Sequence, residues 1–208
     1  MVNGFPLAPT LGYTGCPEGN REIALDHRTT TAASDVRTDT PWPDRIHAHF
    51  KRVGVRQVGY VPDTGHARLI KLCQEDPEII DVVLTSEAEG AGLVAGAALG
   101  GQRAALLMQS SGVGNCINMF SLLQNCGFPC LVLVTMRGEF ADFNPWQVPM
   151  GTATPSVLTA TGVHVRRADV PDDAAEIVAA SAALAFDSAV SVAVLFSQRL
   201  IGAKVFAK

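Results

Sequence analysis

Two carboxylates follow an apolar segment near the middle of the chain, in the sequence LTSEAEG that starts at Leu84. Thr85 and Ser86 are residue types that cap helices, so the pattern predicts a strand that ends at Leu84 and a helix that begins at Glu87. One interpretation is that Glu87 and Glu89 only stabilise the helix through its dipole, by a few tenths to about 1 kcal/mol. The other is that one of them is a working acid at the end of a buried helix. The segment by itself does not distinguish these two roles.

Two other polar segments come directly after predicted strands: Pro62-Asp63-Thr64-Gly65, and SSGVGN at residues 110–115. In an open parallel sheet, ligands bind beyond the carboxyl ends of the strands, so both segments are candidate ligand contacts. The SSGVGN segment is no Walker loop, since no Gly-Lys-Ser/Thr follows, and Ile117 stands where a GxGxxG motif has its last small residue. The sequence contains no nucleophile elbow or metal-ligand cluster, so we expect no metal ligand on this chain. The residues alone indicate a ligand-binding α/β domain with an unusual buried acid.

The elements that position these segments follow from the hydrophobic periodicity. Strands are predicted over residues 57–61, 79–84, 104–108, 130–136, 163–167 and 189–196, and helices over 45–53, 65–74, 87–100, 112–126, 155–160 and 172–186. The long loop 137–154, with its prolines and a tryptophan, is a candidate functional loop. This alternation predicts an α/β fold: an open, doubly wound, mostly parallel sheet of about six strands with helices on both faces. Because the 87–100 helix lacks a polar face, we expect it to be buried on all sides.

Composition and charge limit the class of protein. The chain has 208 residues, of which 48% are hydrophobic and 17% charged, enough for one sizeable core. Residues 1–41 are rich in Gly, Pro, Thr and Asp and are predicted to be a flexible arm, while 42–208 form one domain. A net charge of −4 argues against nucleic acid and membrane partners, and no apolar segment is long enough to cross a bilayer. Five cysteines without a CxxC pair, and a start without signal-peptide features, predict a reduced, cytoplasmic protein.

The order of the motifs resembles the pyrimidine-binding domain of thiamine diphosphate enzymes. Glu87 is followed by Gly96-Ala97-Ala98, a strand, the SGVGN segment at 111–115, and Pro129 before an apolar strand. The family has a tyrosine where Ala97 stands and a proline where Val113 stands, and its spacing to the asparagine is longer.

These departures match a narrower branch of the family. The segments LMQSSGVGN at 107–115, MRGE at 136–139 and QVPMG at 147–151 closely resemble the alpha subunits of sulfopyruvate decarboxylase and the related phosphonopyruvate decarboxylases. The likeness covers residues 45–200, which is essentially everything except the arm. The resemblance implies that residues 42–208 are the thiamine diphosphate pyrimidine-binding domain.

The resemblance also implies a catalytic role for Glu87. In such enzymes a carboxylate hydrogen-bonded to the pyrimidine ring promotes the imino form of thiamine diphosphate, whose nitrogen takes the proton from the thiazolium carbon. The match at residues 96–98 assigns this role to Glu87 rather than Glu89. The activated cofactor adds to the 2-keto carbon of the substrate, and loss of CO2 followed by protonation gives the aldehyde. The predicted cofactor-binding residues are Pro62, Asp63, Thr64, Glu87, Ser111, Gly112 and Asn115.

A partner chain is implied by motifs that the sequence lacks. Thiamine diphosphate enzymes hold the diphosphate through Mg²⁺ in a second domain marked by Gly-Asp-Gly and Asn-Asn, and neither motif occurs here. The resemblance therefore implies that this chain is half of an active site. We expect a beta subunit to bind Mg²⁺ and the diphosphate, in a hetero-oligomer with dimeric alpha/beta pairing.

The anionic tail of a sulfonated or phosphonated pyruvate requires cationic or hydrogen-bonding groups. His66, Arg137 and Gln147 stand near predicted strand ends and are the candidate substrate-binding residues. Arg137 could instead pair with Glu139 or Asp142, and His66 could be a solvated residue of a first helical turn.

The resemblance favours decarboxylation of sulfopyruvate or phosphonopyruvate, and two other functions stay open. A carboligase subunit would use the same cofactor but transfer the intermediate to a second carbonyl compound instead of a proton. A noncatalytic α/β binding or regulatory subunit would keep the fold and lose the chemistry, although the presence of Glu87 argues against this.

Overall fold

Six short strands form one fully parallel sheet in the computed structural model, which describes residues 40–202. The strands are β1 (Val55–Tyr60), β2 (Ile80–Val83), β3 (Arg103–Gln109), β4 (Cys130–Thr135), β5 (His164–Ala168) and β6 (Ser191–Phe196). Their order across the sheet is β2-β1-β3-β4-β6-β5, and every neighbouring pair is parallel. The sheet predicted from the sequence is therefore confirmed, with all six strands at the expected places.

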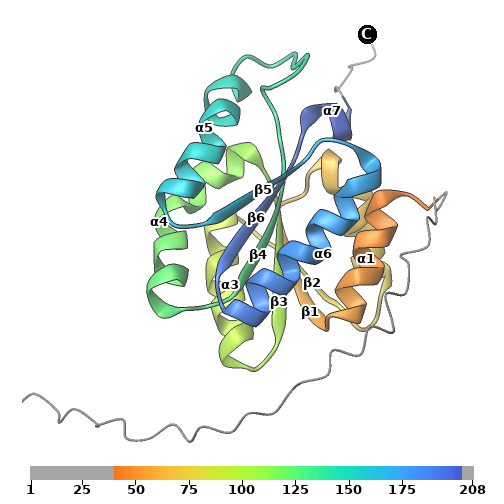
Figure 1. Ribbon diagram of the computed structural model, residues 1–208, viewed down its shortest axis with the longest axis vertical. Coiled ribbons are helices and arrows are strands. Elements are labelled where there is room, and N and C mark those ends of the chain that lie inside the picture. Colours follow the sequence, from red (N-terminus) through yellow and green to blue (C-terminus); the bar gives the residue numbers. More distant parts are fainter. Residues whose placement is uncertain (1–39, 203–208) are drawn as a thin grey trace, which may run out of the picture. The chain divides into compact units, whose positions relative to one another are not determined.

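Helices cover both faces of the sheet, as predicted (Figure 1). On one face, α1 (Trp42–Arg52), α2 (Ala67–Glu75) and α6 (Pro171–Ser188) enclose one apolar core. On the other face, α3 (Glu87–Leu99), α4 (Ser110–Cys126) and α5 (Gln147–Ala160) enclose a second core. Two short elements, the 3-10 turn η1 (Thr64–His66) and α7 (Gln198–Ile201), follow the carboxyl ends of β1 and β6.

The central strand β4 explains why the sequence shows continuous rather than alternating hydrophobicity. Leu131 and Leu133 face the core under α1 and α6, whereas Val132 and Val134 face the core under α3, α4 and α5. All six residues of this strand are buried. A strand covered on both faces needs apolar side chains at every position, which is the pattern that the sequence carries.

The β4–α5 connection is shorter than predicted, and the predicted boundary of α5 is wrong. The helix begins at Gln147 and includes Pro149 and Pro155, although the sequence predicts a loop up to residue 154. Pro149 lies in the first turn, where a backbone N–H has no partner within the helix. Pro155 lies inside the helix and removes one donor there, a cost that the packing of Gly151, Thr154 and Leu158 against the rest of the domain offsets.

The expectation that α3 is buried on all sides is also wrong. Glu89, Gly92, Gly96 and Leu99 line one side of the helix, and Leu99 is 77% exposed. These residues recur at three- and four-residue spacing, so they share one face. The sequence does not reveal this face because, after Glu89, it carries glycine and leucine instead of polar residues.

Two smaller differences concern where helices begin. α4 starts at Ser110, two residues before the predicted start at residue 112, so residues 110–115 are its first turns. α1 starts at Trp42, with Pro43 in its first turn. Most of the predicted arm, residues 1–41, lies outside the described residues. Within residues 40–202, no helix has both the length and the apolar character needed to cross a membrane.

Candidate active site

The sheet reverses its winding direction between β1 and β3. From β1 the chain passes through α2 to the edge strand β2, then returns to β3 and continues the other way to β4. The segment after β1 therefore turns toward one face of the sheet, and the segment after β3 toward the other. In doubly wound folds ligands bind at the carboxyl edge of such a switch point. The predicted segments 62–65 and 110–115 both lie there (Figure 1).

Glu87 is the first residue of α3 and reaches across to the start of α4. Ser86 caps α3 by accepting a hydrogen bond from the backbone N–H of Ala88, which fixes the helix start and hence the direction of the Glu87 side chain. Asn115 Nδ2 donates a 2.9 Å hydrogen bond to Glu87 Oε2. The carboxylate lies against Gly112, where an added Cβ would stand 2.6 Å from Glu87 Cγ. Glycine at this position therefore makes the close approach possible.

Glu89 has a different environment, although it is only two residues away. Its Oε2 accepts a 2.9 Å hydrogen bond from the backbone N–H of Thr85, just before the helix. Together with the Ser86 cap, this bond satisfies backbone N–H groups on both sides of the helix start. Glu89 thus stabilises the start of its own helix, whereas Glu87 is directed toward the switch point.

Asp63, after β1, is the centre of a hydrogen-bond network at the same edge. Its Oδ2 accepts bonds from the backbone N–H of Gly65 at 3.1 Å and from Thr135 Oγ1 at 2.6 Å. Its Oδ1 accepts a 2.9 Å bond from Gln109 Nε2. These partners follow or end β1, β3 and β4, so one carboxylate connects the carboxyl ends of three strands. Its neighbours Pro62 and Thr64 are exposed.

The network continues into α4 through Gln109. Ser111 Oγ donates a 2.9 Å hydrogen bond to Gln109 Oε1. Gln109 occupies the N-cap position of α4 but does not cap the helix backbone, because its amide is engaged by Asp63 and Ser111. Sequence reasoning did not select Gln109 or Thr135. Their position at the last residue of a strand, directly before a predicted site segment, is the signal that could have found them.

His66, a predicted substrate-binding residue, lies in the core and is only 1% exposed. Its Nε2–H donates to the carbonyl of Leu133 at 3.0 Å, and its ring packs edge-on against Phe196. Burial lowers the pKa of His66, which favours the neutral imidazole. Neither the predicted contact with a substrate anion nor the alternative of a solvated residue agrees with this placement, because the fold after β1 turns the side chain inward.

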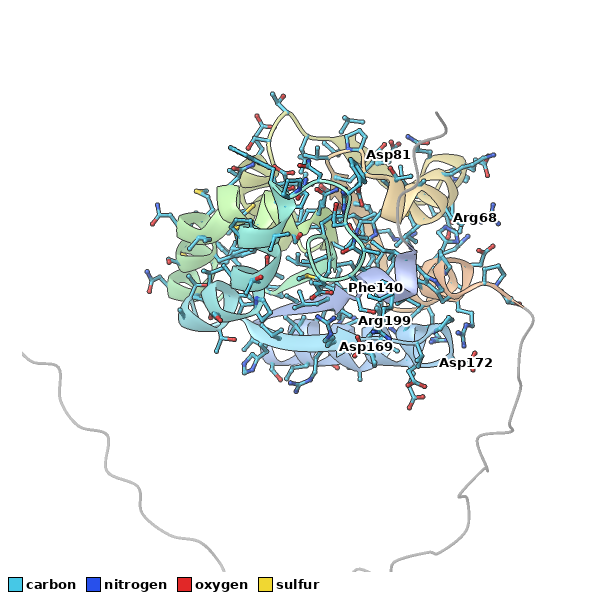
Figure 2. The ribbon with its side chains drawn as sticks, turned by 90° about the horizontal axis from the view of Figure 1, so that it is seen from above. Arg68, Asp81, Phe140, Asp169, Asp172 and Arg199 are labelled. Atoms are coloured by element: carbon cyan, nitrogen blue, oxygen red, sulfur yellow. The ribbon has the colours of Figure 1, made fainter. Side chains whose placement is uncertain are left out.

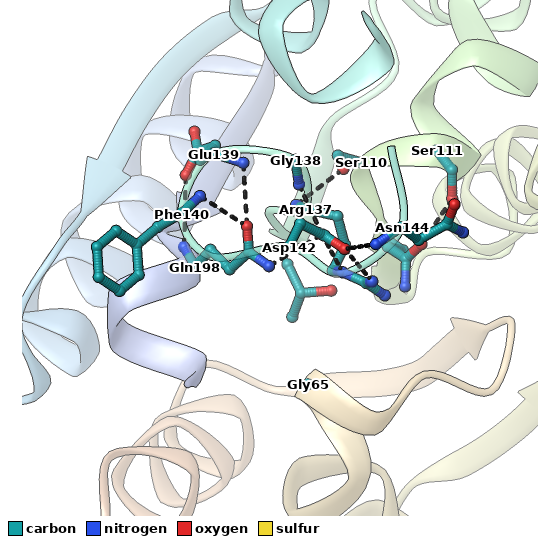
Figure 3. Close-up of polar contacts among 12 residues, drawn as sticks. Gly65, Ser110, Ser111, Arg137, Gly138, Glu139, Phe140, Asp142, Asn144 and Gln198 are labelled. Atoms are coloured by element: carbon teal, nitrogen blue, oxygen red, sulfur yellow. Dashed lines mark hydrogen bonds and ion pairs between the residues drawn. The ribbon is translucent and has the colours of Figure 1, made fainter. Parts of the chain in front are cut away.

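Arg137, the second predicted substrate-binding residue, pairs with Asp142, which was an alternative that the sequence left open (Figure 3). Two parallel bonds of 2.7 Å join Nε and an Nη of Arg137 to the carboxylate, and the Arg137 side chain is 5% exposed. The backbone N–H groups of Gly138 and Asn144 and the Gln198 amide also donate to Asp142. These bonds, led by those from Arg137, hold the pKa of Asp142 well below its usual range. The charge of Arg137 is therefore already compensated within the chain.

The segment 137–144 is anchored on both sides of this ion pair. The backbone N–H of Arg137 donates to Ser110 Oγ in α4, and Gln198 Oε1 in α7 accepts from the N–H groups of Glu139 and Phe140 (Figure 3). A cation–π contact lies on the outer surface of the segment. The Arg199 guanidinium is 4.4 Å from the centre of the Phe140 ring, and Figure 2 shows the two residues next to each other.

Gln147, the third predicted substrate-binding residue, is the first residue of α5 and is half-buried. Its amide oxygen is buried and has no hydrogen-bond partner among residues 40–202. Sulfonate and phosphonate oxygens accept hydrogen bonds, so only the amide nitrogen of Gln147 suits such a tail. Within the same residues, no group of three or more His, Cys, Asp or Glu side chains is arranged to hold a metal ion.

Comparison with known proteins identifies relatives of this chain. The chain is 34% identical over 152 residues to sulfopyruvate decarboxylase subunit alpha of Methanocaldococcus jannaschii, which covers 73% of this chain and 90% of that protein. It is 32% identical over 153 residues to the protein of the same name from Methanothermobacter thermautotrophicus, covering 73% and 93%. Phosphonopyruvate decarboxylase of Streptomyces viridochromogenes is 35% identical over 108 residues, which are 51% of this chain but 27% of that longer protein. No protein-family model matches the chain.

Solved structures agree with the fold. A 2-oxoglutarate:ferredoxin oxidoreductase from Magnetococcus marinus superposes with a TM-score of 0.65 at 17% identity, over 78% of this chain and 29% of that chain. A putative thiamin diphosphate-dependent enzyme from Mycobacterium smegmatis gives a TM-score of 0.61 at 12% identity, over 81% and 34%. The chain thus matches only 29% and 34% of these two longer chains. Because the chain is 34% and 32% identical to two sulfopyruvate decarboxylase alpha subunits and covers 90% and 93% of their lengths, it belongs to the family of these subunits.

Proposed function

We propose that this chain is the pyrimidine-binding alpha subunit of a thiamine diphosphate-dependent decarboxylase. Its substrate is sulfopyruvate or phosphonopyruvate, and each turnover consumes one proton and releases CO2 and the corresponding aldehyde. A beta subunit carries the site for Mg²⁺ and the diphosphate. The observation that carries the proposal is the position of the Glu87 carboxylate, which the Ser86 cap, Gly112 and Asn115 together hold at the switch point.

The residues at the switch point fit an aminopyrimidine. Such a ring needs a carboxylate opposite one ring nitrogen and small residues where the ring approaches the backbone. Glu87 is the carboxylate, and Gly112 is the small residue that lets this carboxylate lie against the start of α4. Asn115 engages Oε2 of Glu87, so it orients the carboxylate plane and the second oxygen remains for the ring. The further proposed contacts of this chain are Ser111 and Asp63, with Pro62 and Thr64 exposed beside Asp63.

The chain's own contribution to the reaction is to hold and orient the pyrimidine ring of the cofactor. When bound, thiamine diphosphate supplies the nucleophilic carbon and accepts the electron pair that the departing CO2 leaves behind. Glu87 holds a proton at the pyrimidine ring nitrogen, which requires an ionised carboxylate in a fixed direction. The 137–144 segment lies beside α4 and is attached to it through the bond from the Arg137 N–H to Ser110 Oγ.

Only one of the three predicted substrate-binding residues is retained as a contact of the substrate's anionic tail. Because Arg137 is compensated by Asp142 and His66 is buried, we place neither as a direct ligand of the sulfonate or phosphonate in this arrangement. Gln147, at the start of α5, remains the proposed contact of this chain with the tail. Both acids are small tetrahedral anions that the same donors recognise, so the proposal covers both, in line with the two substrates in the names of its relatives.

The test is reconstitution of the chain with its beta subunit. The complex, with thiamine diphosphate and Mg²⁺, is given sulfopyruvate or phosphonopyruvate, and CO2, aldehyde and hydroxyketone are quantified. We expect equimolar CO2 and aldehyde from at least one keto acid, and no turnover by either subunit alone. A hydroxyketone product would identify a carboligase instead. Tight binding of Mg²⁺ and cofactor with full turnover by the isolated chain would contradict the two-subunit site.

A further inference from the structure

Trp146, at the start of α5, is the most exposed large apolar side chain among residues 40–202. It is 82% exposed, and its neighbours in sequence Phe143 and Val148 are 49% and 43% exposed. A groove of about 460 Å³ on the same helix is lined by Trp146, Pro149, Met150 and Ala153. Together the side chains of residues 143, 146, 148–150 and 153 form what we call the Trp146 surface.

The backbone that carries Trp146 is held in place by the loop before it. Asn144 Oδ1 accepts a 3.1 Å hydrogen bond from the N–H of Trp146, and the N–H of Asn144 donates to Asp142 Oδ1 at 3.0 Å. Asp142 is held in turn by two bonds from Arg137. An aromatic side chain on a fixed backbone loses little conformational freedom when a partner covers it, so it is well suited to be an anchor of an interface.

The Trp146 surface adjoins the candidate active site through α4. Met150 Sδ lies against Gly114, where an added Cβ would stand 3.2 Å from the sulfur. Gly114 precedes Asn115, whose amide donates to Glu87 Oε2. Figure 1 shows that the segment between β4 and α5 lies at the same end of the molecule as α7, which follows the carboxyl end of β6. Whatever covers the Trp146 surface therefore lies beside the turn of α4 that orients Glu87.

Size and charge limit what can cover this surface. From their exposed fractions, Trp146, Phe143 and Val148 present on the order of 350 Å² of apolar area. No Lys, Arg, Asp or Glu occurs between residues 143 and 165. A small keto acid with an anionic tail cannot cover such an area and finds no cation in it. The area lies in the range of apolar patches that mark interaction sites, and it is close to half of the roughly 800 Å² that each protein contributes to a standard interface.

The position of the surface distinguishes between two protein partners. A second copy of this chain, seated on the Trp146 surface, would lie over the carboxyl edge of the sheet beside α4. It would bring a second Glu87 there and occupy the place of the subunit that the proposed function needs for Mg²⁺ and the diphosphate. A beta subunit at the same place completes the site instead of blocking it.

We propose that the Trp146 surface is the docking surface for the beta subunit, with Trp146 as its anchor. The inference rests on the proposed function, which requires a second subunit at the switch point. It also states the chemistry of the partner. The beta subunit offers an uncharged, apolar pocket that is wide enough for an indole ring, because the Trp146 surface has no charge with which a charged partner could pair.

The first measurement is hydroxyl-radical footprinting of the full chain, alone and mixed with its beta subunit, in the absence of cofactor. Mass spectrometry gives the oxidation rate of each side chain. We expect the oxidation of Trp146 to fall by about fivefold or more in the complex, because an interface anchor is fully desolvated. Leu99 is the internal control, since it is 77% exposed and ends α3 about 20 Å away from the carboxyl edge at which that helix begins. Its oxidation rate should not change.

The second measurement is the affinity of the two subunits by titration calorimetry, again without cofactor. Trp146→Ser should fold as the wild type does, because the side chain that it loses is exposed, and circular dichroism checks this. Its affinity for the beta subunit should fall about 30-fold or more, the loss typical of an interface hot spot. Trp146→Phe should recover part of that loss, and Leu99→Ser should bind as the wild type does.

Unchanged oxidation of Trp146 in the complex would overturn the inference, even if the complex is an active decarboxylase. Equal losses of affinity in Trp146→Ser and Leu99→Ser would overturn it as well. Protection of Trp146 in a complex without decarboxylase activity would refute the proposed function and leave the docking surface standing. Protection that rises with the concentration of the chain alone, together with self-association that Trp146→Ser abolishes, would assign the surface to a second copy and refute the inference.

Discussion

Asn115 Nδ2 donates a 2.9 Å hydrogen bond to Glu87 Oε2 and so joins the beginning of α4 to the first turn of α3. The two residues come from segments that follow different strands, and the bond fixes the one carboxylate of α3 that points to the switch point. Several expected outcomes depend on this relationship and on the network beside it.

Glu87→Gln removes the charge and keeps the size of the side chain. We expect kcat of the reconstituted complex to fall by about 10²- to 10⁴-fold, the range for loss of a proton-handling group. Glu89→Gln is the matched control, because Glu89 accepts from the N–H of Thr85 within its own helix cap. It should change the free energy of unfolding by less than about 1 kcal/mol and leave kcat unchanged. Full turnover by Glu87→Gln would instead favour a noncatalytic subunit.

Gly112→Ala tests whether the Glu87 position depends on an absent side chain. The new Cβ would overlap Glu87, whose flexible side chain must then move away. We therefore expect a folded variant with greatly reduced turnover, measured by circular dichroism and by the decarboxylation assay. Gly96→Ala is the control, since nothing lies within 4 Å of its Cβ, and it should stabilise α3 by about 0.5 to 1 kcal/mol. Normal turnover by Gly112→Ala would contradict the proposed role of this contact.

Asp142→Asn tests the ion pair with Arg137. The Asp142 side chain is only 2% exposed, so the variant leaves a buried guanidinium without its counter-charge. The expected loss is about 3 kcal/mol in the free energy of unfolding, measured with urea at pH 7. Asp169→Asn breaks the exposed pair with Arg167, where Asp169 is 60% exposed, and should cost less than about 0.5 kcal/mol. Similar losses of unfolding free energy in both variants would mean that the burial of Asp142 does not increase the contribution of its ion pair to stability.

The ion pair of Asp142 with Arg137 also predicts that the free energy of unfolding depends on pH. Because the pKa of Asp142 is lowered in the folded chain, its contribution is fully present above the unfolded-state pKa of about 4 and is lost as pH falls toward the folded-state value. The difference in unfolding free energy between wild type and Asp142→Asn should be the same at pH 7 and pH 5 and smaller at pH 3. Other carboxylates titrate in both proteins and largely cancel in this comparison. A difference that persists undiminished at pH 3 would contradict the assignment to Asp142.

Much of the fold could be predicted from the sequence because β4 and β6 are buried on both faces and their apolar runs are continuous. The extent of α5 could not be predicted, since Pro149 and Pro155 are interpreted as helix breakers unless their place in the helix is known. The open face of α3 was missed for a related reason. Glycines at positions 92 and 96 look the same in a sequence whether or not a neighbour covers them.

The segments of the candidate site could be located from the sequence, whereas the hydrogen bonds between their side chains could not. Asp63 and Ser111 stand in segments selected by their position after strands, and Glu87 was separated from Glu89 by the family resemblance alone; the structure brings these segments to one edge. Gln109 was missed because its function lies in connecting two other side chains. The partner of Arg137 stayed ambiguous because two carboxylates follow within five residues, and only the turn of the chain after β4 decides between them.

Asp142 receives five hydrogen bonds from four residues, and three of these residues, Arg137, Gly138 and Asn144, belong to the 137–144 segment itself. The buried ion pair therefore closes the segment on itself and stays intact if the segment moves as one body. The contacts that hold the segment to the rest of the domain are its bonds to Ser110 and Gln198 and the ion pair of Glu139 with Arg167. The segment is thus stiff within itself, and its attachment depends on α4, α7 and β5.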